Sequence, residues 1–275
     1  MKNYFGMNNL KAIILAAGEG KRLRPLTDDR PKTMVNLFGM SLLERQIITL
    51  NNCGINDIVV VGGYKDETII FPNIKKYQNL DYDSTNMVET LFCADSEMND
   101  SIIISYGDII FEKDVLTSII NSNEDYSVVV DKDWKKYWEL RFENPLHDAE
   151  SLRLDSMDNI IEIGQNVQNI DDIQGQYIGL IKFQGKGLEF VKKFYQKTKD
   201  EFKKTGKNLL NPKIPFRKSY MTDFIQGLVN EGCKIKAISI NNGWLELDNN
   251  NDYNIYNNMY QTGKISEFIK LDNKK

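Results

Sequence analysis

Short apolar runs alternate with amphipathic stretches through the first half of the chain, a pattern typical of buried strands separated by helices. The run at 10–16 (LKAIILA) is the clearest strand, and Ser41 and Glu44 have the spacing of a helix capping box, with Gly54 as the stop. The expected strands are 10–16, 57–61, 102–105 and 126–130, and the expected helices are 41–53, 86–97 and 112–121. This order predicts an α/β fold with a mostly parallel, doubly wound sheet.

The pattern changes after Asp131. We expect short antiparallel strands at 138–142, 151–154 and 160–163, followed by a strand at 177–183, helices at 188–204 and 220–230, strands at 235–240 and 244–248, and a helix at 252–261. The chain is therefore interpreted as a single domain, with a core at about 8–131 and 175–262 and a small antiparallel insertion at about 132–174.

Composition excludes several classes of protein. The 275 residues include 35 basic and 39 acidic side chains, for a net charge of −4, which excludes a generally basic nucleic-acid binder. No apolar run approaches the roughly 18–20 residues of a membrane span, and Met1–Asn9 lacks the apolar centre of a secretion signal. Three scattered cysteines and one histidine, His147, disfavour a disulfide framework and a Cys/His zinc site. We expect a cytoplasmic protein.

A glycine-rich loop, AGEGKR at 17–22, follows the first strand. Glycines let successive backbone N–H groups turn inward and form a nest for an anion. A dinucleotide fingerprint would need glycine at Leu23, and a Walker A loop would need Ser or Thr at Arg22, so neither motif fits. The alternative is an ordinary turn with solvated bases, which the proximity of Arg24 and Lys32 disfavours.

The run Leu15-Ala16-Ala17-Gly18-x-Gly20-x-Arg22-Leu23, with Pro31-Lys32 after it, resembles the sugar-phosphate nucleotidyltransferase superfamily. The resemblance implies a Rossmann-like core that holds a nucleoside triphosphate at the carboxyl edge of its sheet. It implies that Gly18, Gly20 and Arg22 contact the triphosphate and that Lys32 contacts phosphate oxygens, while Lys21 lies where the family fixes no residue. The expected nucleotide-binding residues are Leu15, Ala16, Ala17, Gly18, Gly20, Lys21, Arg22, Gly63, Asn86 and Asp108.

Two acids are candidates to bind the Mg²⁺ that such a transfer between anions needs. Asp108 follows the third apolar strand, where ligands bind in open α/β sheets, and matches a metal-binding aspartate of the family. Trp244-Leu245-Glu246-Leu247-Asp248 resembles the family's second acidic strand end. We expect Asp108 and Asp248 as ligands, with Glu246 as a ligand or a neighbour; the alternative for Asp248 is a helix cap. The expected catalytic residues are Arg22, Lys32, Asp108 and Asp248.

The Thr85-Asn86-Met87-Val88 run resembles bacterial cytidylyltransferases that activate small phosphorylated amines, and it places Asn86 near the base or ribose. An asparagine helix cap is the alternative for Asn86.

The insertion contains aromatic and charged side chains suited to an ammonium group. The expected acceptor-binding residues are Asp131, Trp134, Trp138, Arg141, Tyr177 and Trp244. Arg141 could instead hold a carboxylate or phosphonate, and the tryptophans could simply be core residues. His147 is expected in a surface loop.

The sequence thus predicts an Mg²⁺-dependent cytidylyltransferase that joins CMP from CTP to a small phosphorylated amine or amino acid, of the phosphocholine, 2-aminoethylphosphonate or phosphoglutamine type, and releases pyrophosphate. The resemblance implies a role in cell-surface polysaccharide synthesis and allows a homodimer. One alternative is a sugar-1-phosphate nucleotidyltransferase that uses UTP, dTTP or GTP. Another is a catalytically silent nucleotide-binding subunit, which the complete set of site residues disfavours.

Overall fold

The computed structural model describes residues 10–271, so the polar segment Met1–Asn9 and the expected core boundary near residue 8 lie outside the described residues. A seven-stranded sheet forms the centre, in the order β12-β8-β11-β6-β1-β4-β5. Its strands are β1 (Leu10–Ala16), β4 (Asp57–Gly62), β5 (Ile74–Gln78), β6 (Ser101–Tyr106), β8 (Tyr126–Asp131), β11 (Gln176–Gln184) and β12 (Lys236–Ile240). Only β11 runs antiparallel to its neighbours, β6 and β8, which confirms the mostly parallel sheet.

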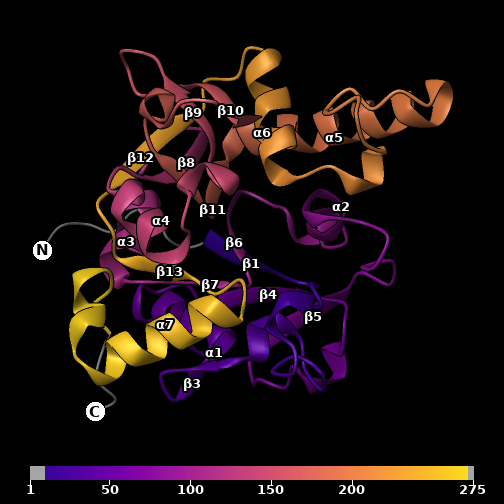
Figure 1. Ribbon diagram of the computed structural model, residues 1–275. Helices are drawn as coiled ribbons and strands as arrows, with labels where there is room; N and C mark the ends of the chain where they lie inside the picture. The colour runs from indigo at the N-terminus through magenta and orange to yellow at the C-terminus, as the bar shows by residue number, and fades with distance from the viewer. Residues whose placement is uncertain (1–9, 272–275) are drawn as a thin grey trace, which may run out of the picture.

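Helices cover both faces of this sheet (Figure 1). They are α1 (Leu42–Asn52), α2 (Met87–Phe92), α3 (Lys113–Ile120), α4 (Trp134–Arg141), α5 (Gly185–Thr205), α6 (Met221–Asn230) and α7 (Asn250–Gln261). Ser41 caps α1 as expected, because its side chain accepts a hydrogen bond from the N–H of Glu44. Helices α1, α3, α4 and α7 pack on one face and α2, α5 and α6 on the other, so the sheet is doubly wound.

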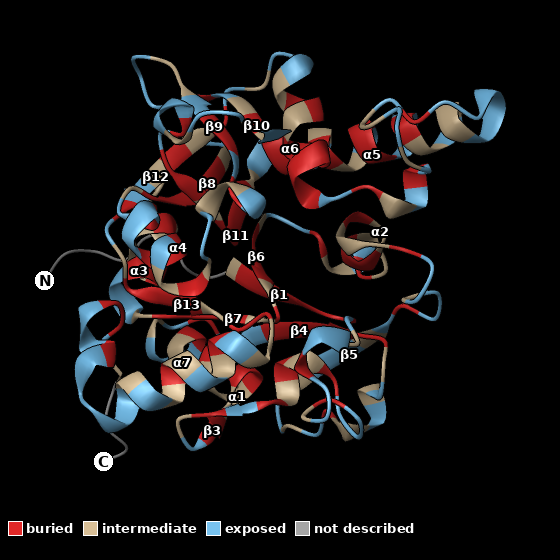
Figure 2. Cartoon of the chain, in the orientation of Figure 1, coloured by how far each residue is buried: buried red, intermediate tan, exposed pale blue. Residues whose placement is uncertain are grey.

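Side chains of β1 alternate between the two cores. Ala12 and Ile14 face the core that contains α1, whereas Ile13 and Leu15 face the core that contains α2. Both faces of the central strands are buried, as Figure 2 shows for β1, β4 and β8. This explains why β1 is a continuous apolar run rather than an alternating one.

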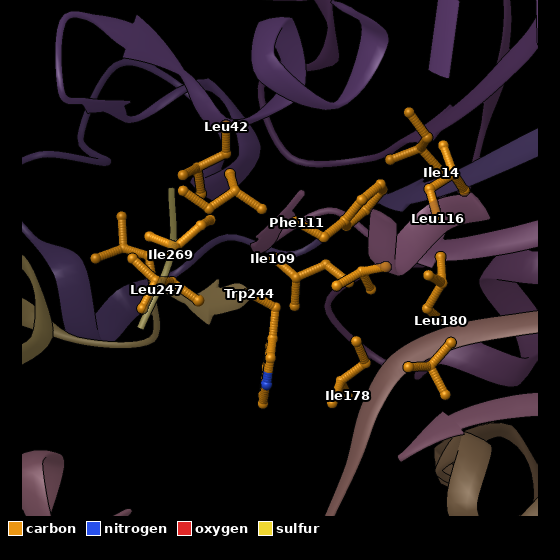
Figure 3. Close-up of a cluster of buried hydrophobic side chains, with 14 of the residues drawn as sticks. Ile14, Leu42, Ile109, Phe111, Leu116, Ile178, Leu180, Trp244, Leu247 and Ile269 are labelled. Atoms are coloured by element: carbon orange, nitrogen blue, oxygen red, sulfur yellow. The ribbon is translucent and has the colours of Figure 1, made fainter. Parts of the chain in front are cut away.

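A small antiparallel pair joins distant parts of the chain at the carboxyl edge of the sheet. Strand β13 (Trp244–Glu246) pairs with β7 (Ile109–Phe111), with Glu246 opposite Ile109. The N–H of Leu247 donates to the carbonyl of Asp108 over 2.9 Å. Figure 3 shows Ile109, Phe111, Trp244 and Leu247 within one buried cluster, which anchors this pair. The pairing places Asp108 and Asp248 next to each other.

The strand expected at 138–142 is wrong: residues 138–141 belong to α4, and Phe142 is the residue that follows the helix. Tyr137 and Trp138 favour strands by propensity, but their helical spacing with Trp134 buries all three rings against one core. The helix expected at 86–97 is also shorter, because α2 ends at Phe92 and a separate 3₁₀ turn covers Asp95–Glu97.

The remaining short strands form two further pairs. They are β2 (Asn36–Leu37) with β3 (Met40–Ser41), and β9 (Glu150–Leu154) with β10 (Ile160–Asn166). The second pair contributes Leu152, Ile160 and Ile163 to the core under α6. Within residues 10–271, no helix has the length and apolar character that crossing a membrane would require.

Candidate active site

The glycine loop packs tightly against Lys32. Gly20 has a left-handed backbone (φ +69°), and a Cβ atom there would lie 2.9 Å from the Cβ of Lys32. The Thr27 hydroxyl donates to the Gly20 carbonyl over 2.9 Å and holds the loop in this position. Glycine is therefore required at position 20 by both conformation and space.

Lys32 joins the two predicted metal ligands. Its Nζ lies 2.8 Å from Asp108 Oδ2 and 2.9 Å from Asp248 Oδ1. Arg22 binds Asp248 through both terminal nitrogens, with Nη1 and Nη2 each 2.7 Å from a carboxylate oxygen. The structure thus brings together all four predicted catalytic residues.

The ion pairs set the protonation of this cluster. Burial opposes the charge of Lys32, but the Asp108 and Asp248 carboxylates outweigh it and raise the pKa of the ammonium above its usual range. For Asp248, burial raises the pKa, whereas Lys32 and Arg22 more than compensate and lower it below the usual value. The lysine is therefore charged and Asp248 ionised at neutral pH.

Asp108 has a free coordination position. Its Oδ2 binds Lys32, while its Oδ1 is buried and has no hydrogen-bond partner. In the described part of the chain, no three His, Cys, Asp or Glu side chains form a ready-made metal site. A hard divalent cation can, however, be held by one or two carboxylates together with phosphate oxygens and water. The pair Asp108–Asp248 fits such an ion if it arrives with a phosphorylated ligand.

Glu246 lies apart from these ion pairs, in contact with a different cation. Its Oε2 is 2.8 Å from Nη1 of Arg141. Burial raises the pKa of Glu246 to about 7 against the opposing effect of Arg141, and Asp108 adds to the increase. Because β13 ends at Glu246, the chain turns before Asp248, and the two acids do not share one partner.

A first pocket lies beside the loop and reaches Lys32 and Asp108. Its lining is Leu15, Ala16, Ala17, Gly18, Lys32, Thr33, Tyr82, Thr85, Asn86, Met87, Thr90, Tyr106, Gly107 and Asp108. Asn86 does cap α2, since its side chain accepts from the N–H of Met87 over 2.8 Å. Of the predicted nucleotide-binding residues, Gly20, Lys21, Arg22 and Gly63 are absent from this lining.

Gly20 packs against Lys32, and the other three residues also lie outside the lining. Lys21 is exposed and pairs with Glu19, and Arg22 is bound to Asp248. Gly63 packs against the wall of the pocket, because a Cβ there would lie 2.7 Å from the Cβ of Tyr82.

A second pocket shares Met87 and Tyr106 with the first. It combines three carboxylates with four further aromatic rings. Its lining is Met87, Tyr106, Trp138, Asp148, Glu150, Gln176, Tyr177, Ile178, Gly179, Tyr220, Thr222, Trp244 and Glu246. The indole N–H of Trp138 donates to Asp148 Oδ2 over 3.1 Å. No lysine or arginine is part of the lining, so the pocket favours a cationic group.

The acids of this pocket repel one another. Burial of the carboxyl, together with the carboxylates of Asp148 and Asp223, raises the pKa of Glu150 to about 7. A bound cation would lower that pKa again, because it favours the ionised form.

Three predicted acceptor-binding residues do not line this pocket. Asp131 is fully buried, and its Oδ2 accepts a 2.8 Å hydrogen bond from the Trp244 indole. Trp134 is core, with its ring centroid 5.8 Å from that of Trp138. Arg141 is buried against Asp252, with Nε and Nη2 at 3.1 and 3.0 Å from the carboxylate. These residues support the wall that Trp138, Tyr177 and Trp244 line.

Sequence reasoning named none of Tyr82, Tyr106, Asp148 and Glu150 as a site residue. Tyr106 directly precedes the Gly107-Asp108 turn, a signal that could have identified it. Asp148 and Glu150 lie two apart in a charged stretch, but only the folded chain brings them beside Trp244.

Comparison with known proteins places these features in context. The model of the MobA-like NTP transferase domain family matches residues 12–156. The chain is 40% identical over 251 residues to the CTP:phosphoglutamine cytidylyltransferase of Campylobacter jejuni, covering 87% of this chain and 96% of that protein.

Two solved structures share the fold. The CTP:phosphocholine cytidylyltransferase of Streptococcus pneumoniae matches with a TM-score of 0.68 and 21% identity, over 92% of this chain and 99% of that one. The inositol-1-phosphate CTP transferase of T. maritima matches with a TM-score of 0.68 and 22% identity, over 95% and 98% of the two chains.

Proposed function

The chain belongs to the MobA-like NTP transferase family, and on that premise we propose that it joins CMP from CTP to a small phosphorylated amine or amino acid and releases pyrophosphate. The observation that carries the proposal is the cluster of Lys32, Asp108 and Asp248 at one end of the first pocket, beside the acidic, aromatic second pocket. The similarity to the Campylobacter jejuni enzyme supports the choice of nucleotide.

The reaction brings two anions together, since an acceptor phosphate oxygen attacks the α-phosphorus of the nucleotide. Positioning and charge neutralisation are therefore the main tasks of the site. We assign the neutralisation to Lys32 and Arg22, which are now bound to carboxylates. When phosphates enter, these cations can exchange a carboxylate partner for a phosphate oxygen.

We assign Asp108 and Asp248 as the residues that hold Mg²⁺. Members of the family generally use a divalent metal, and the unpartnered Oδ1 of Asp108 supplies a ligand atom for it. The bound ion would neutralise phosphate oxygens and stabilise the charge that develops during transfer. Glu246, held by Arg141, is assigned to the boundary between the metal ligands and the second pocket.

We assign the nucleotide to the first pocket, with Ala16, Ala17 and Gly18 along the phosphates and Asn86 and Thr85 toward the base or ribose. Asn79 supports this wall, because its buried amide nitrogen donates to the hydroxyls of Thr85 and Thr90 over 2.8 and 2.9 Å. A cytosine donor and acceptor pattern can be selected by such fixed polar groups.

We assign the acceptor to the second pocket. In this assignment the acceptor phosphate points toward Asp108. The ammonium end of the acceptor lies among Asp148, Glu150 and the Trp138 ring. The expected insertion at about 132–174 thus contributes Trp138, Asp148 and Glu150 to the acceptor site. The proposed setting is cytoplasmic synthesis of activated precursors for a cell-surface polysaccharide.

Pyrophosphate release with CTP and a panel of acceptors tests this function. Phosphocholine, 2-aminoethylphosphonate and phosphoglutamine are compared with glucose 1-phosphate at equal concentration. The proposal expects turnover with at least one of the nitrogen-containing acceptors. Turnover with glucose 1-phosphate alone would favour the sugar-1-phosphate enzyme, and no turnover with any pair would favour a silent subunit.

A further inference from the structure

The turn that carries Asp108 is held from three directions. The N–H of Gly107 donates to the carbonyl of Leu15, and the N–H of Leu247 donates to the carbonyl of Asp108, each over 2.9 Å. These two bonds attach the turn to β1 and to the segment after β13. The third attachment comes from Gln46 on α1, on the core side of the turn.

Gln46 bridges the turn with a single amide group. Its Nε2 donates to the carbonyls of Tyr106, at 2.9 Å, and Ile109, at 2.7 Å. Its Oε1 accepts from the hydroxyl of Ser105 over 2.9 Å. Both protons of the amide nitrogen are thereby used, and the partners fix which end of the amide is nitrogen. The two bound carbonyls lie on either side of Asp108 in the sequence.

Gln46 is buried, so losing its hydrogen bonds would destabilise the folded protein. Its side chain is 1% exposed, and the other buried residues of α1 are Leu42, Leu43 and Leu50. A buried polar group without partners is destabilising, and the same holds for a carbonyl left without a donor. An apolar residue at this position would therefore remove the Gln46 donor of the Ile109 carbonyl and leave the Tyr106 carbonyl with only the Ser105 hydroxyl, at 3.2 Å.

We propose that Gln46 is a positioning residue for the metal ligand Asp108, acting through the backbone on both sides of it. The inference rests on the proposed metal role of Asp108. Residues behind a metal ligand typically change metal affinity by about 10–100-fold when they are removed. Because Gln46 acts through the backbone rather than on the carboxylate itself, we expect the lower end of that range.

A matched pair of variants separates positioning from simple stability. Gln46→Met keeps the side-chain length and removes two hydrogen bonds to carbonyls, together with the bond from the Ser105 hydroxyl. Lys182→Met also removes two hydrogen bonds to carbonyls, together with a positive charge, because the Nζ of this buried lysine donates to the carbonyls of Ile120 and Ser122 over 2.8 and 2.7 Å. The Lys182 bonds lie near Ser127 on β8, away from both pockets.

The measurement is the increase in Tm that MgCl₂ produces in the presence of a nonreactive CTP analogue, since a ligand that binds the folded state stabilises it. Both variants should lower Tm without ligand. Gln46→Met should need about tenfold more Mg²⁺ for half of the full increase, whereas Lys182→Met should match the wild type. Equal Mg²⁺ requirements for the two variants would overturn the proposal.

A milder variant covers the case in which Gln46→Met does not fold. Ser105→Ala removes the hydroxyl that binds the Gln46 amide and also lies 3.2 Å from the Tyr106 carbonyl, but it keeps both Gln46 donors. It should raise the Mg²⁺ requirement by a smaller factor, and an unchanged requirement counts against the proposal. Asp108→Asn tests the metal role of Asp108 separately from the positioning role of Gln46. If its Mg²⁺ response equals that of the wild type, the metal site is wrongly assigned, whatever Gln46 does.

Discussion

At the scale of single residues, the proposed active site is a set of charges that compensate one another before substrate binds. Lys32 and Arg22 together provide two positive charges to the carboxylates of Asp108 and Asp248. The charges of Lys32, Asp108 and Asp248 tolerate their partial burial because each has a partner, while Arg22 approaches from the exposed side. These groups are already oriented when phosphates enter, which reduces the reorganisation that transfer requires.

Asp108→Asn keeps the shape of the side chain and removes its charge. We expect kcat to fall by about 10²–10³, as when a preorganised electrostatic group is lost, while the fold survives. Steady-state pyrophosphate release at saturating Mg²⁺ measures the effect. Asp133→Asn, an exposed position outside both pockets, is the control. Wild-type turnover by Asp108→Asn would remove this residue from the metal site.

Glu150 should make acceptor binding depend on pH. Because its folded pKa is raised to about 7, the carboxyl is largely protonated at pH 6 and ionised at pH 8. An ammonium group binds the ionised form, so the acceptor KM should be several-fold higher at pH 6 than at pH 8. The same raised pKa means that the contribution of Glu150 to folding stability is present below about pH 4.5 and is lost as the pH rises through about 7.

The comparison with Glu150→Gln isolates this effect from protonation of the acceptor phosphate, whose second pKa is about 6. The KM of the variant should change less between the two pH values than that of the wild type. Identical pH profiles for the two proteins would exclude Glu150 from acceptor binding.

At the scale of elements, helix α4 connects the second pocket to the proposed metal ligands. Trp138 lines the second pocket, and Arg141, at the end of the same helix, binds Glu246 and Asp252. The Asp252 carboxylate in turn accepts from the N–H of Asp248 over 2.9 Å. Helix α4 therefore supports the proposed active site through a continuous set of polar contacts.

Two tryptophans on this helix separate binding from packing. Trp138→Leu removes the aromatic face from the pocket, worth about 0.5–2 kcal/mol to a bound cation, so the acceptor KM should rise by a few-fold to about tenfold with the CTP KM unchanged. Trp134→Leu should lower Tm without changing either KM, since Trp134 lies outside the pocket lining. Equal acceptor KM values in both variants would mean that both rings are only core.

At the scale of the whole molecule, the sheet brings residues from far apart in the chain to one edge. The carboxyl ends of β1 and β6 lead to the glycine loop and Asp108, and β13 adds Asp248 by pairing with β7. In Figure 1, β1 and β6 lie between α2 on one side and β7 and β13 on the other. The two pockets share Met87 and Tyr106 at this place.

Sequence patterns predicted the helices and strands that carry a local signal, such as an apolar run or a capping residue. The apolar run of β1 and the Ser41 cap of α1 are examples. Strand β5 was missed because it is an edge strand, in which Lys75 and Lys76 are exposed and only Ile74 and Tyr77 are half-buried. No apolar run therefore marks this strand.

The positions of Asp108 and Asp248 were predictable because each lies two residues after the end of a strand. The partner of Arg141 was not, because Asp252 lies on a different helix and meets the guanidinium only in the folded chain. The same holds for Asp131, whose carboxylate binds the indole of Trp244. Contacts between residues far apart in the sequence determine whether a charged side chain lines the pocket or is buried in the core.

The relative use of CTP and UTP is the most direct test that the protein is a cytidylyltransferase. With the best phosphorylated acceptor at saturation, kcat/KM for each nucleotide is measured by pyrophosphate release. Cytosine and uracil differ in the donor and acceptor at ring position 4, so a pocket that binds one leaves polar groups unpaired with the other. We expect kcat/KM for CTP to exceed that for UTP by at least about 10²-fold. Comparable values for the two nucleotides would contradict this expectation.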